Sequence, residues 1–246
     1  MKPYYSHAGI EIYHGDCREV LPSLEVRLDC IVTSPPYNQR LDQFKASGFK
    51  AEGSAQWADR ISSSYFDSLP EDEYQQSQVE VLDWLFASAN KGCSLFYNHK
   101  CRWRDKVLLH PMDIFRRSKW AVRQEIIWAR DGSLTQNAKM FPPSEERIIW
   151  GFKDEWRWNQ DANRWMSVWR IDSAKNTSHP VAFPLEIPKR AIVATTIPGD
   201  VVCDPFMGSG TVLRAAKDLG RRAVGIEVNE EYAEIAAKRL AQEVLF

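Results

Sequence analysis

The tetrad Ser34-Pro35-Pro36-Tyr37 has residue types that could hold a flat ring carrying an exocyclic amine. It ends the apolar run 29–33, which predicts a buried strand that cannot continue through two prolines. In open α/β sheets, ligands bind beyond that end of the strands. A hydroxyl, rigid backbone carbonyls and an aromatic ring would meet the ligand there. An ordinary strand-to-loop turn with a packing tyrosine is the alternative.

A second segment, 199–211, predicts a strand, a glycine-rich turn and the start of a helix. The lysine of a P-loop and the third glycine of a dinucleotide fingerprint are both absent. Asp204, before the turn, suits a ligand with a positive group, and Glu227, at the end of the next strand, suits ribose hydroxyls. These two acids favour S-adenosylmethionine over a phosphate-bearing cofactor. A purely structural glycine turn is the alternative.

Composition is that of a globular chain with room for one large α/β domain or two small ones: 246 residues, 44% hydrophobic and 26% charged. No apolar stretch approaches the roughly 18 residues that span a membrane, and residues 1–7 lack the apolar core of a signal peptide. We therefore expect a cytoplasmic protein with no membrane partner. The five cysteines form no Cys-x-x-Cys pair, so neither a disulfide framework nor a metal site is predicted.

Strand-like and helix-like segments alternate along the chain, which predicts βα units and a mainly parallel sheet. The expected strands are 9–13, 29–33, 93–97, 124–129, 147–152, 201–203 and 223–226. The expected helices are 16–22, 73–91, 101–119, 184–195, 209–219 and 229–243. Segment 39–65 is polar and follows the tetrad directly, so it predicts a long loop, which is either functional or disordered. Segment 153–180 is polar and rich in tryptophan, and predicts a second insertion.

In this order, the two motifs resemble the amino-group DNA methyltransferases of the permuted beta arrangement, in which a Ser/Asp-Pro-Pro-Tyr/Phe tetrad precedes the S-adenosylmethionine loop. The resemblance covers most of the chain and is weakest over 39–70 and 153–178. It implies a single domain over 1–246 with a Rossmann-like methyltransferase fold, whose seven-stranded, mainly parallel sheet has one antiparallel edge strand. It also implies a catalytic-side DNA-contacting loop at 39–70 and a small target-recognition insertion at 153–178.

The resemblance also assigns the cofactor site. Asp16 would accept a hydrogen bond from the adenine amine, Cys17 would contribute backbone, and Phe183 would lie near the methionine part. The full set of residues expected to bind S-adenosylmethionine is Asp16, Cys17, Thr33, His179, Phe183, Asp204, Phe206, Gly208, Ser209, Gly210, Thr211, Glu227 and Val228.

The implied chemistry at the tetrad is methylation of an exocyclic amine, whose lone pair is delocalised into the ring. Hydrogen bonds to Ser34 Oγ and the Pro35 carbonyl would localise that lone pair, while Pro36 stiffens the loop. Tyr37 would stack on a base flipped out of the duplex. Cytosine-C5 methylation needs a Pro-Cys pair, and none exists here. Serine at position 34 is more typical of N4-cytosine than of N6-adenine enzymes, so cytosine N4 is favoured and adenine N6 is the alternative.

The net charge of −1 does not by itself indicate a nucleic-acid binder, although eight Lys or Arg face two Asp between positions 100 and 123. The residues expected to contact DNA are Asn38, Arg40, Lys45, Lys50, Arg102, Arg157 and Arg164. A homodimer and a cognate restriction enzyme are left open as partners. RNA, small-molecule or protein substrates compete with DNA. A non-catalytic nucleic-acid-binding module and, more distantly, a NAD-dependent enzyme also compete.

Overall fold

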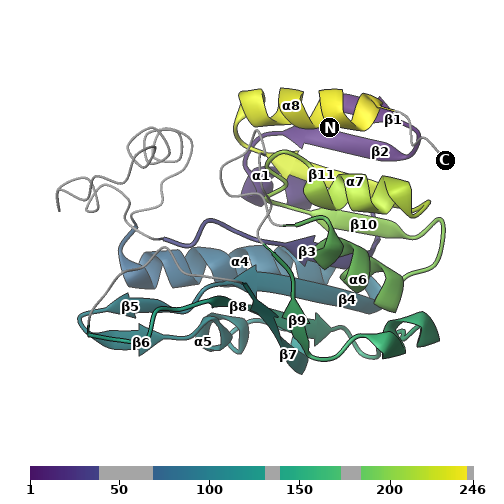
Figure 1. The fold of residues 1–246 in the computed structure, drawn as a ribbon. Coiled ribbons are helices and arrows are strands. Elements are labelled where there is room, and N and C mark those ends of the chain that lie inside the picture. Colours follow the sequence, from purple (N-terminus) through teal and green to yellow (C-terminus); the bar gives the residue numbers. More distant parts are fainter. Residues whose placement is uncertain (39–68, 131–138, 173–183, 243–246) are drawn as a thin grey trace.

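The computed structural model describes residues 1–38, 69–130, 139–172 and 184–242 (Figure 1). One large sheet runs through the molecule with strand order β1-β2-β11-β10-β3-β4-β8-β7-β9. Its strands are β1 (Tyr5–His7), β2 (Ile10–His14), β3 (Leu28–Thr33), β4 (Ala89–His99), β7 (Ala121–Ala129), β8 (Glu145–Phe152), β9 (Val168–Arg170), β10 (Val201–Asp204) and β11 (Arg222–Glu227).

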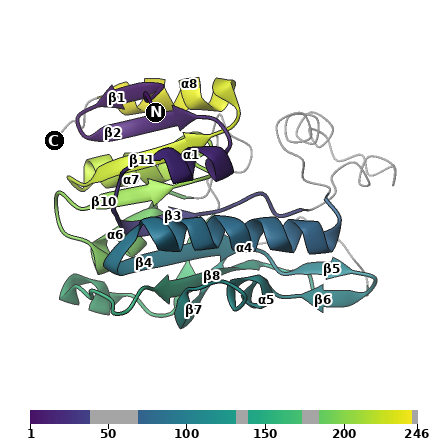
Figure 2. The same cartoon turned by 180° about the vertical axis from the view of Figure 1, so that it is seen from behind.

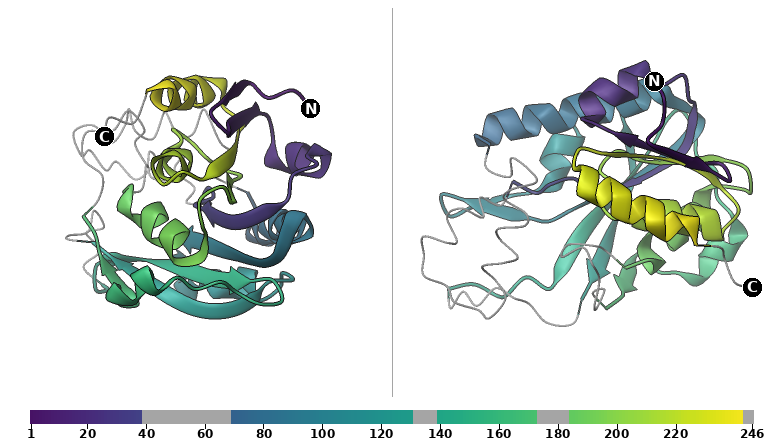
Figure 3. Two further views of the ribbon diagram at one scale, coloured as in Figure 1. Left: turned by 90° about the vertical axis from the view of Figure 1, so that its right-hand side faces the viewer. Right: turned by 90° about the horizontal axis from the view of Figure 1, so that it is seen from above.

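Helices cover both faces of this sheet, as the view along the strands makes plain (Figure 3, left). On one face lie α6 (Glu186–Thr195), α7 (Thr211–Asp218) and α8 (Glu230–Ala241). The other face, turned to the viewer in Figure 2, carries α1 (Cys17–Ser23), α4 (Glu71–Ser88) and α5 (Pro111–Phe115). Each face has its own apolar core. Because both faces are buried, the central strands are nearly continuously apolar, as in β3 and β10.

The expected α/β fold class is confirmed, but the sheet differs from the expected seven strands with one antiparallel edge strand. In the described residues, this sheet has nine strands. The antiparallel strand β8 lies inside the sheet between β4 and β7, and a second antiparallel strand, β1, forms an edge beside β2. The other edge is β9, which pairs in parallel with β7 and belongs to segment 153–180, expected to be an insertion. Strands added at an edge satisfy backbone groups that would otherwise be exposed.

Residues 101–119 form no single helix, contrary to the sequence expectation. They form the hairpin of β5 (Arg102–Arg104) and β6 (Val107–Leu109), followed by the short helix α5. Asp105 and Lys106 both have positive φ, 50° and 69°, which is the geometry of a tight two-residue hairpin turn. The hairpin follows the end of β4, so it lies at the carboxyl edge of the parallel strands (Figure 1).

Candidate active site

A row of polar side chains crosses four adjacent strands where the apolar core of one sheet face ends. The members are Ser34 after β3, Asn98 in β4, Glu146 in β8 and Arg130 after β7. Each is two positions from a core residue of that face, respectively Val32, Phe96, Ile148 and Trp128. Side chains two apart in a strand share a face, and the register pairs Asn98 with Ile148 and Trp128 with Glu146. Strand pairing therefore brings together residues distant in sequence.

Hydrogen bonds link this row to the tetrad. Ser34 Oγ lies 2.6 Å from the Tyr37 hydroxyl, which donates to Glu146 Oε2 at 2.9 Å. Asn98 Nδ2 lies within 3.3 Å of Ser34 Oγ and donates to the Tyr37 hydroxyl at 2.7 Å and to Glu146 Oε2 at 2.8 Å. Two residues of the predicted tetrad are thus joined to a buried amide and a buried carboxylate.

Two cations face the second oxygen of the Glu146 carboxylate. Lys100 Nζ is 3.6 Å and an Arg130 guanidinium nitrogen 3.4 Å from Oε1. Glu146 is buried, so these cations and its two hydrogen-bond donors offset the cost of removing a charge from water. Burial, and next the Glu146 carboxylate, raise the pKa of Tyr37 well above its ordinary value. Tyr37 therefore keeps its proton.

The backbone of the tetrad is held from α4. The Tyr74 hydroxyl donates to the Pro36 carbonyl at 2.7 Å and lies 2.6 Å from His99 Nε2. Burial, with Arg102 nearby, lowers the pKa of His99 to about 3, so this imidazole is neutral. Tyr37 is 9% exposed, and its ring packs on His99 at a centroid distance of 4.6 Å. One face of Tyr37 is therefore already covered, and its stacking on a base stays a prediction for the other face.

Most of the described residues expected to bind the cofactor gather where β2, β10 and β11 end, and Thr33 ends the neighbouring strand β3. The Glu227 carboxylate accepts from the backbone N–H groups of Gly208 at 2.8 Å and Asn229 at 2.9 Å, and its carbonyl accepts from Gly15. Glu227 thus binds three loops together and is buried. Asp16 caps α1 through the N–H of Arg18 and pairs with the Arg18 guanidinium, while Cys17 is buried and the neighbouring Val228 is exposed.

Asp204 connects this group to the tetrad strand. Its carboxylate accepts from Thr33 Oγ1 at 2.9 Å and from the Phe206 N–H at 3.1 Å. Burial raises the pKa of Asp204 to about 7. A cation bound nearby would favour its ionised form, so this site suits a positively charged ligand.

The glycine turn has the conformation that the sequence predicts. Gly210 has φ 77° at the start of α7, and a Cβ there would lie 3.0 Å from the Ala236 Cβ. The flanking Ser209 and Thr211 are buried. Arg239 of α8 donates to the Ser209 carbonyl and to Thr211 Oγ1 at 3.3 and 3.2 Å. Helix α8 therefore fixes the turn from behind.

Of the described residues expected to contact DNA, Asn38 and Arg102 lie beside the tetrad but are buried, whereas Arg157 and Arg164 lie away from it. Asn38 is fully buried, and its amide donates to the Leu69 carbonyl. Arg102 is buried in a two-pronged ion pair with Glu71, both bonds 2.7 Å. Arg157 pairs with Asp200 at the start of β10, which is the edge opposite to Ser34.

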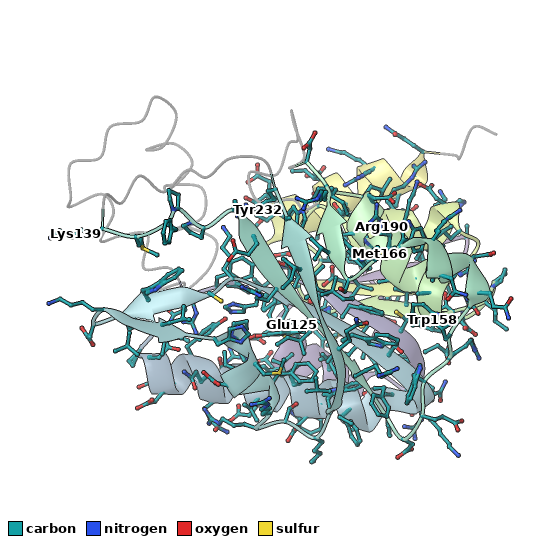
Figure 4. All side chains as sticks on the ribbon, turned by 60° about the horizontal axis from the view of Figure 1, so that its bottom comes forward. Glu125, Lys139, Trp158, Met166, Arg190 and Tyr232 are labelled. Atoms are coloured by element: carbon teal, nitrogen blue, oxygen red, sulfur yellow. The ribbon has the colours of Figure 1, made fainter. Side chains whose placement is uncertain are left out.

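Arg164 ends η1 (Gln160–Arg164), which packs beside α6 near Arg157. In Figure 4 the neighbouring Trp158 lies at the end of the molecule opposite to Lys139. Other expected residues lie outside the described part of the chain: Arg40, Lys45, Lys50, His179 and Phe183. The loop at 39–70 is described only from residue 69, and the insertion at 153–178 only to residue 172.

Asn98 and Glu146 are the site residues that the motifs do not reveal. The alternation of buried and exposed positions along a strand could have indicated them. Glu146 shares a phase with Ile148 and Trp150, and Asn98 with Phe96, so each polar residue sits in a buried phase. In the described residues, no three His, Cys, Asp or Glu side chains gather as metal ligands, and no helix is long and apolar enough to cross a membrane.

Comparison with known proteins identifies several similar chains. Residues 28–238 match the DNA methylase family N6_N4_Mtase. The type II methyltransferase M.ScaI of Streptomyces caespitosus is 28% identical over 98% of this chain and 84% of its own. M.Cfr9I of Citrobacter freundii is 30% identical over 96% and 89%.

Solved structures agree with the fold. The PvuII DNA methyltransferase described as cytosine-N4-specific superimposes with a TM-score of 0.78 at 17% identity, covering 100% of this chain and 91% of its own. A DNA modification methylase of Thermus thermophilus, solved with S-adenosyl-L-methionine, has a TM-score of 0.64 at 26% identity. That match covers 94% of this chain and 92% of the other.

Proposed function

This chain belongs to the DNA methylase family whose model matches residues 28–238. From that membership, we propose that the protein transfers a methyl group from S-adenosylmethionine to the exocyclic N4 of cytosine in DNA. The order of the tetrad before the glycine turn further supports the permuted beta arrangement within this family. Adenine N6 is the alternative target atom.

The residues at the ends of β2, β10 and β11 fit this cofactor. Asp204, Glu227 and Asp16 are carboxylates at one sheet edge, and burial gives Asp204 a pKa of about 7 that a nearby cation would lower. When bound, S-adenosylmethionine supplies a methyl group on a positively charged sulfur. The Thermus relative, at 26% identity, was solved with this molecule.

Ser34 supplies the acceptor for the target amine. A hydrogen bond from the amine to Ser34 Oγ, with a second to the Pro35 carbonyl, localises the nitrogen lone pair so that it can attack the methyl carbon. The nitrogen–carbon bond forms as the carbon–sulfur bond breaks, and the nitrogen then releases a proton. Strands β3 and β10 are adjacent and joined by the Thr33–Asp204 hydrogen bond, which supports in-line approach.

The observation that carries the choice of cytosine is the neutral hydroxyl of Ser34 at the first position of the tetrad. The test incubates the protein with labelled S-adenosylmethionine and duplex DNA, single-stranded DNA or RNA, followed by digestion and mass spectrometry of the nucleosides. We expect N4-methylcytosine from DNA, and none from the Ser34→Ala variant, which should still bind the cofactor.

Other outcomes contradict the proposal. N6-methyladenosine alone would reassign the target to adenine, and methylated RNA alone would reassign the substrate. Calorimetry without S-adenosylmethionine binding would instead favour a non-catalytic nucleic-acid-binding module. Because M.ScaI and M.Cfr9I are named type II methyltransferases, a cognate restriction enzyme is the partner we propose.

The DNA strand around the target base is proposed to meet a hollow beside the tetrad. This cavity of about 170 Å³ is lined by Ala129, Arg130, Arg170, Ile171 and Asp172. Arg130 also faces the Glu146 carboxylate, and Arg170 pairs with Ala129 in the sheet register. Two guanidinium groups at this edge suit a backbone phosphate next to a flipped base.

A further inference from the structure

Glu146 lies outside both motifs, yet the hydrogen bonds of the tetrad end on it. Its side chain accepts from the Tyr37 hydroxyl and from Asn98 Nδ2. A carboxylate can only accept hydrogen bonds, and the cations of Lys100 and Arg130 lie 3.6 and 3.4 Å from its second oxygen. Glu146 is therefore a fixed acceptor at the end of a hydrogen-bonded chain.

Because Glu146 can only accept, the hydrogen bonds that link Ser34, Tyr37 and Glu146 all run in one direction. The single proton of the Tyr37 hydroxyl goes to Glu146, so the 2.6 Å contact between Tyr37 and Ser34 must be donated by Ser34. The Ser34 proton is then committed to Tyr37, and Ser34 Oγ offers lone pairs to an incoming donor. Asn98 is oriented by the same carboxylate, because its amide nitrogen rather than its oxygen must face Glu146.

We infer that Glu146 is a positioning residue, which sets the direction of the hydrogen bonds through Tyr37 and Asn98 so that Ser34 Oγ accepts from the amine of the target base. This inference rests on the proposed amino-methyltransferase function. In the reverse direction, Ser34 would donate its proton to the amine lone pair, and that proton would compete with the methyl group for the same electrons.

The decisive variant is Glu146→Gln, because the glutamine amide is close in shape but can donate through Nε2. The Tyr37 proton could then turn toward Ser34. We expect the single-turnover rate on DNA, at saturating cofactor, to fall on the order of a hundredfold, as when a preorganised polar partner is lost. Cofactor affinity and the KM for DNA should stay near wild type. Glu146→Asp, which keeps an acceptor, should recover much of the rate.

Glu125→Gln is the matched control, since Glu125 of β7 is half-buried and pairs with His110 and Arg147 rather than with the tetrad. Its rate should not change. Tyr37→Phe should lower the rate, and Glu146→Gln should add less in that background than it costs alone, because only the link through Asn98 remains between Glu146 and Ser34.

An unchanged rate in Glu146→Gln would overturn the inference, as would a loss that adds in full to that of Tyr37→Phe. A loss of cofactor or DNA binding in parallel with the rate would assign Glu146 a purely structural role. Should Glu146→Gln fail to fold, a wild-type rate in Tyr37→Phe would overturn it. If the wild-type protein itself methylates no DNA, the proposed function fails before any variant is compared.

Discussion

Asp204 should make cofactor binding depend on pH. Burial gives this carboxyl a pKa of about 7 in the free protein, and a bound cation favours the ionised form. Below pH 7 the cation must displace a proton, so the dissociation constant for S-adenosylmethionine should rise by up to about tenfold per pH unit. Above pH 7 the dissociation constant should not change with pH. Isothermal titration calorimetry between pH 5.5 and 8, buffer values chosen around that pKa, measures this directly.

Asp204→Asn is the control, since an amide does not titrate in this range. Its binding should be weaker and independent of pH. A wild-type dissociation constant that is constant across the range would show that Asp204 does not meet the positive charge.

Site residues that stand in short contiguous motifs could be predicted from the sequence, whereas those brought together by strand pairing could not. Ser34 and Asp204 stand in short segments whose residue types indicate the chemistry of the site. Their strands are adjacent in the structure. Asn98 and Glu146 could not be assigned in the same way. Their meaning depends on the register of β4, β8 and β7, which places them beside Ser34.

Gly225 of β11 packs against the glycine turn and α7, so a larger side chain at this position would clash with them. A Cβ on Gly225 would lie 2.5 Å from Met207 Sδ and 2.7 Å from a methyl carbon of Leu213. We expect Gly225→Ala to cost about 1–3 kcal/mol of stability through overpacking. The displaced turn should also bind S-adenosylmethionine more weakly. Thermal unfolding and calorimetry measure the two effects.

Gly199→Ala separates crowding at the turn from backbone strain. Gly199 has φ +88°, a Cβ there would meet no atom within 4 Å, and the residue precedes β10 at the opposite edge. This variant should lose stability but keep full cofactor affinity. Equal loss of affinity in both variants would contradict a local role for Gly225.

The elements themselves were predictable where local pattern and tertiary context agree. The expected strands 29–33, 201–203 and 223–226 correspond to β3, β10 and β11. The expected helix 101–119 was wrong because the turn at Asp105 and Lys106 reverses the chain into a hairpin. The place of β8 within the sheet could not be inferred from its own residues, since strand order is set by packing between elements.

Across the whole molecule, the two ends of the sheet should differ in their contribution to DNA binding. Arg170 is exposed at the edge that carries the tetrad, whereas Arg164 lies beside α6, with its guanidinium over Trp165. Arg170→Ala should weaken DNA binding and reduce the slope of affinity against salt by about one ion. Arg164→Ala should change both less.

Fluorescence anisotropy with a labelled duplex at several salt concentrations compares the two variants. A larger loss of DNA affinity in Arg164→Ala than in Arg170→Ala would instead support the target-recognition insertion that the sequence predicted at 153–178. The net charge of −1 gave no guide to this question, because a DNA-binding face depends on where the cations lie and not on their sum.

The hydrogen bond from the Asn38 amide to the Leu69 carbonyl, 3.0 Å long, brings together the two ends of the stretch between these residues. Arg104 also holds the Asn38 carbonyl, so the junction is secured from the hairpin as well. Closing a longer loop adds little to its entropic cost. Over evolutionary time, this stretch can therefore gain, lose or exchange residues while the junction and the inherited chemistry below it stay the same. A change in the length of the chain between Asn38 and Leu69 need therefore not reach the residues that carry the chemistry.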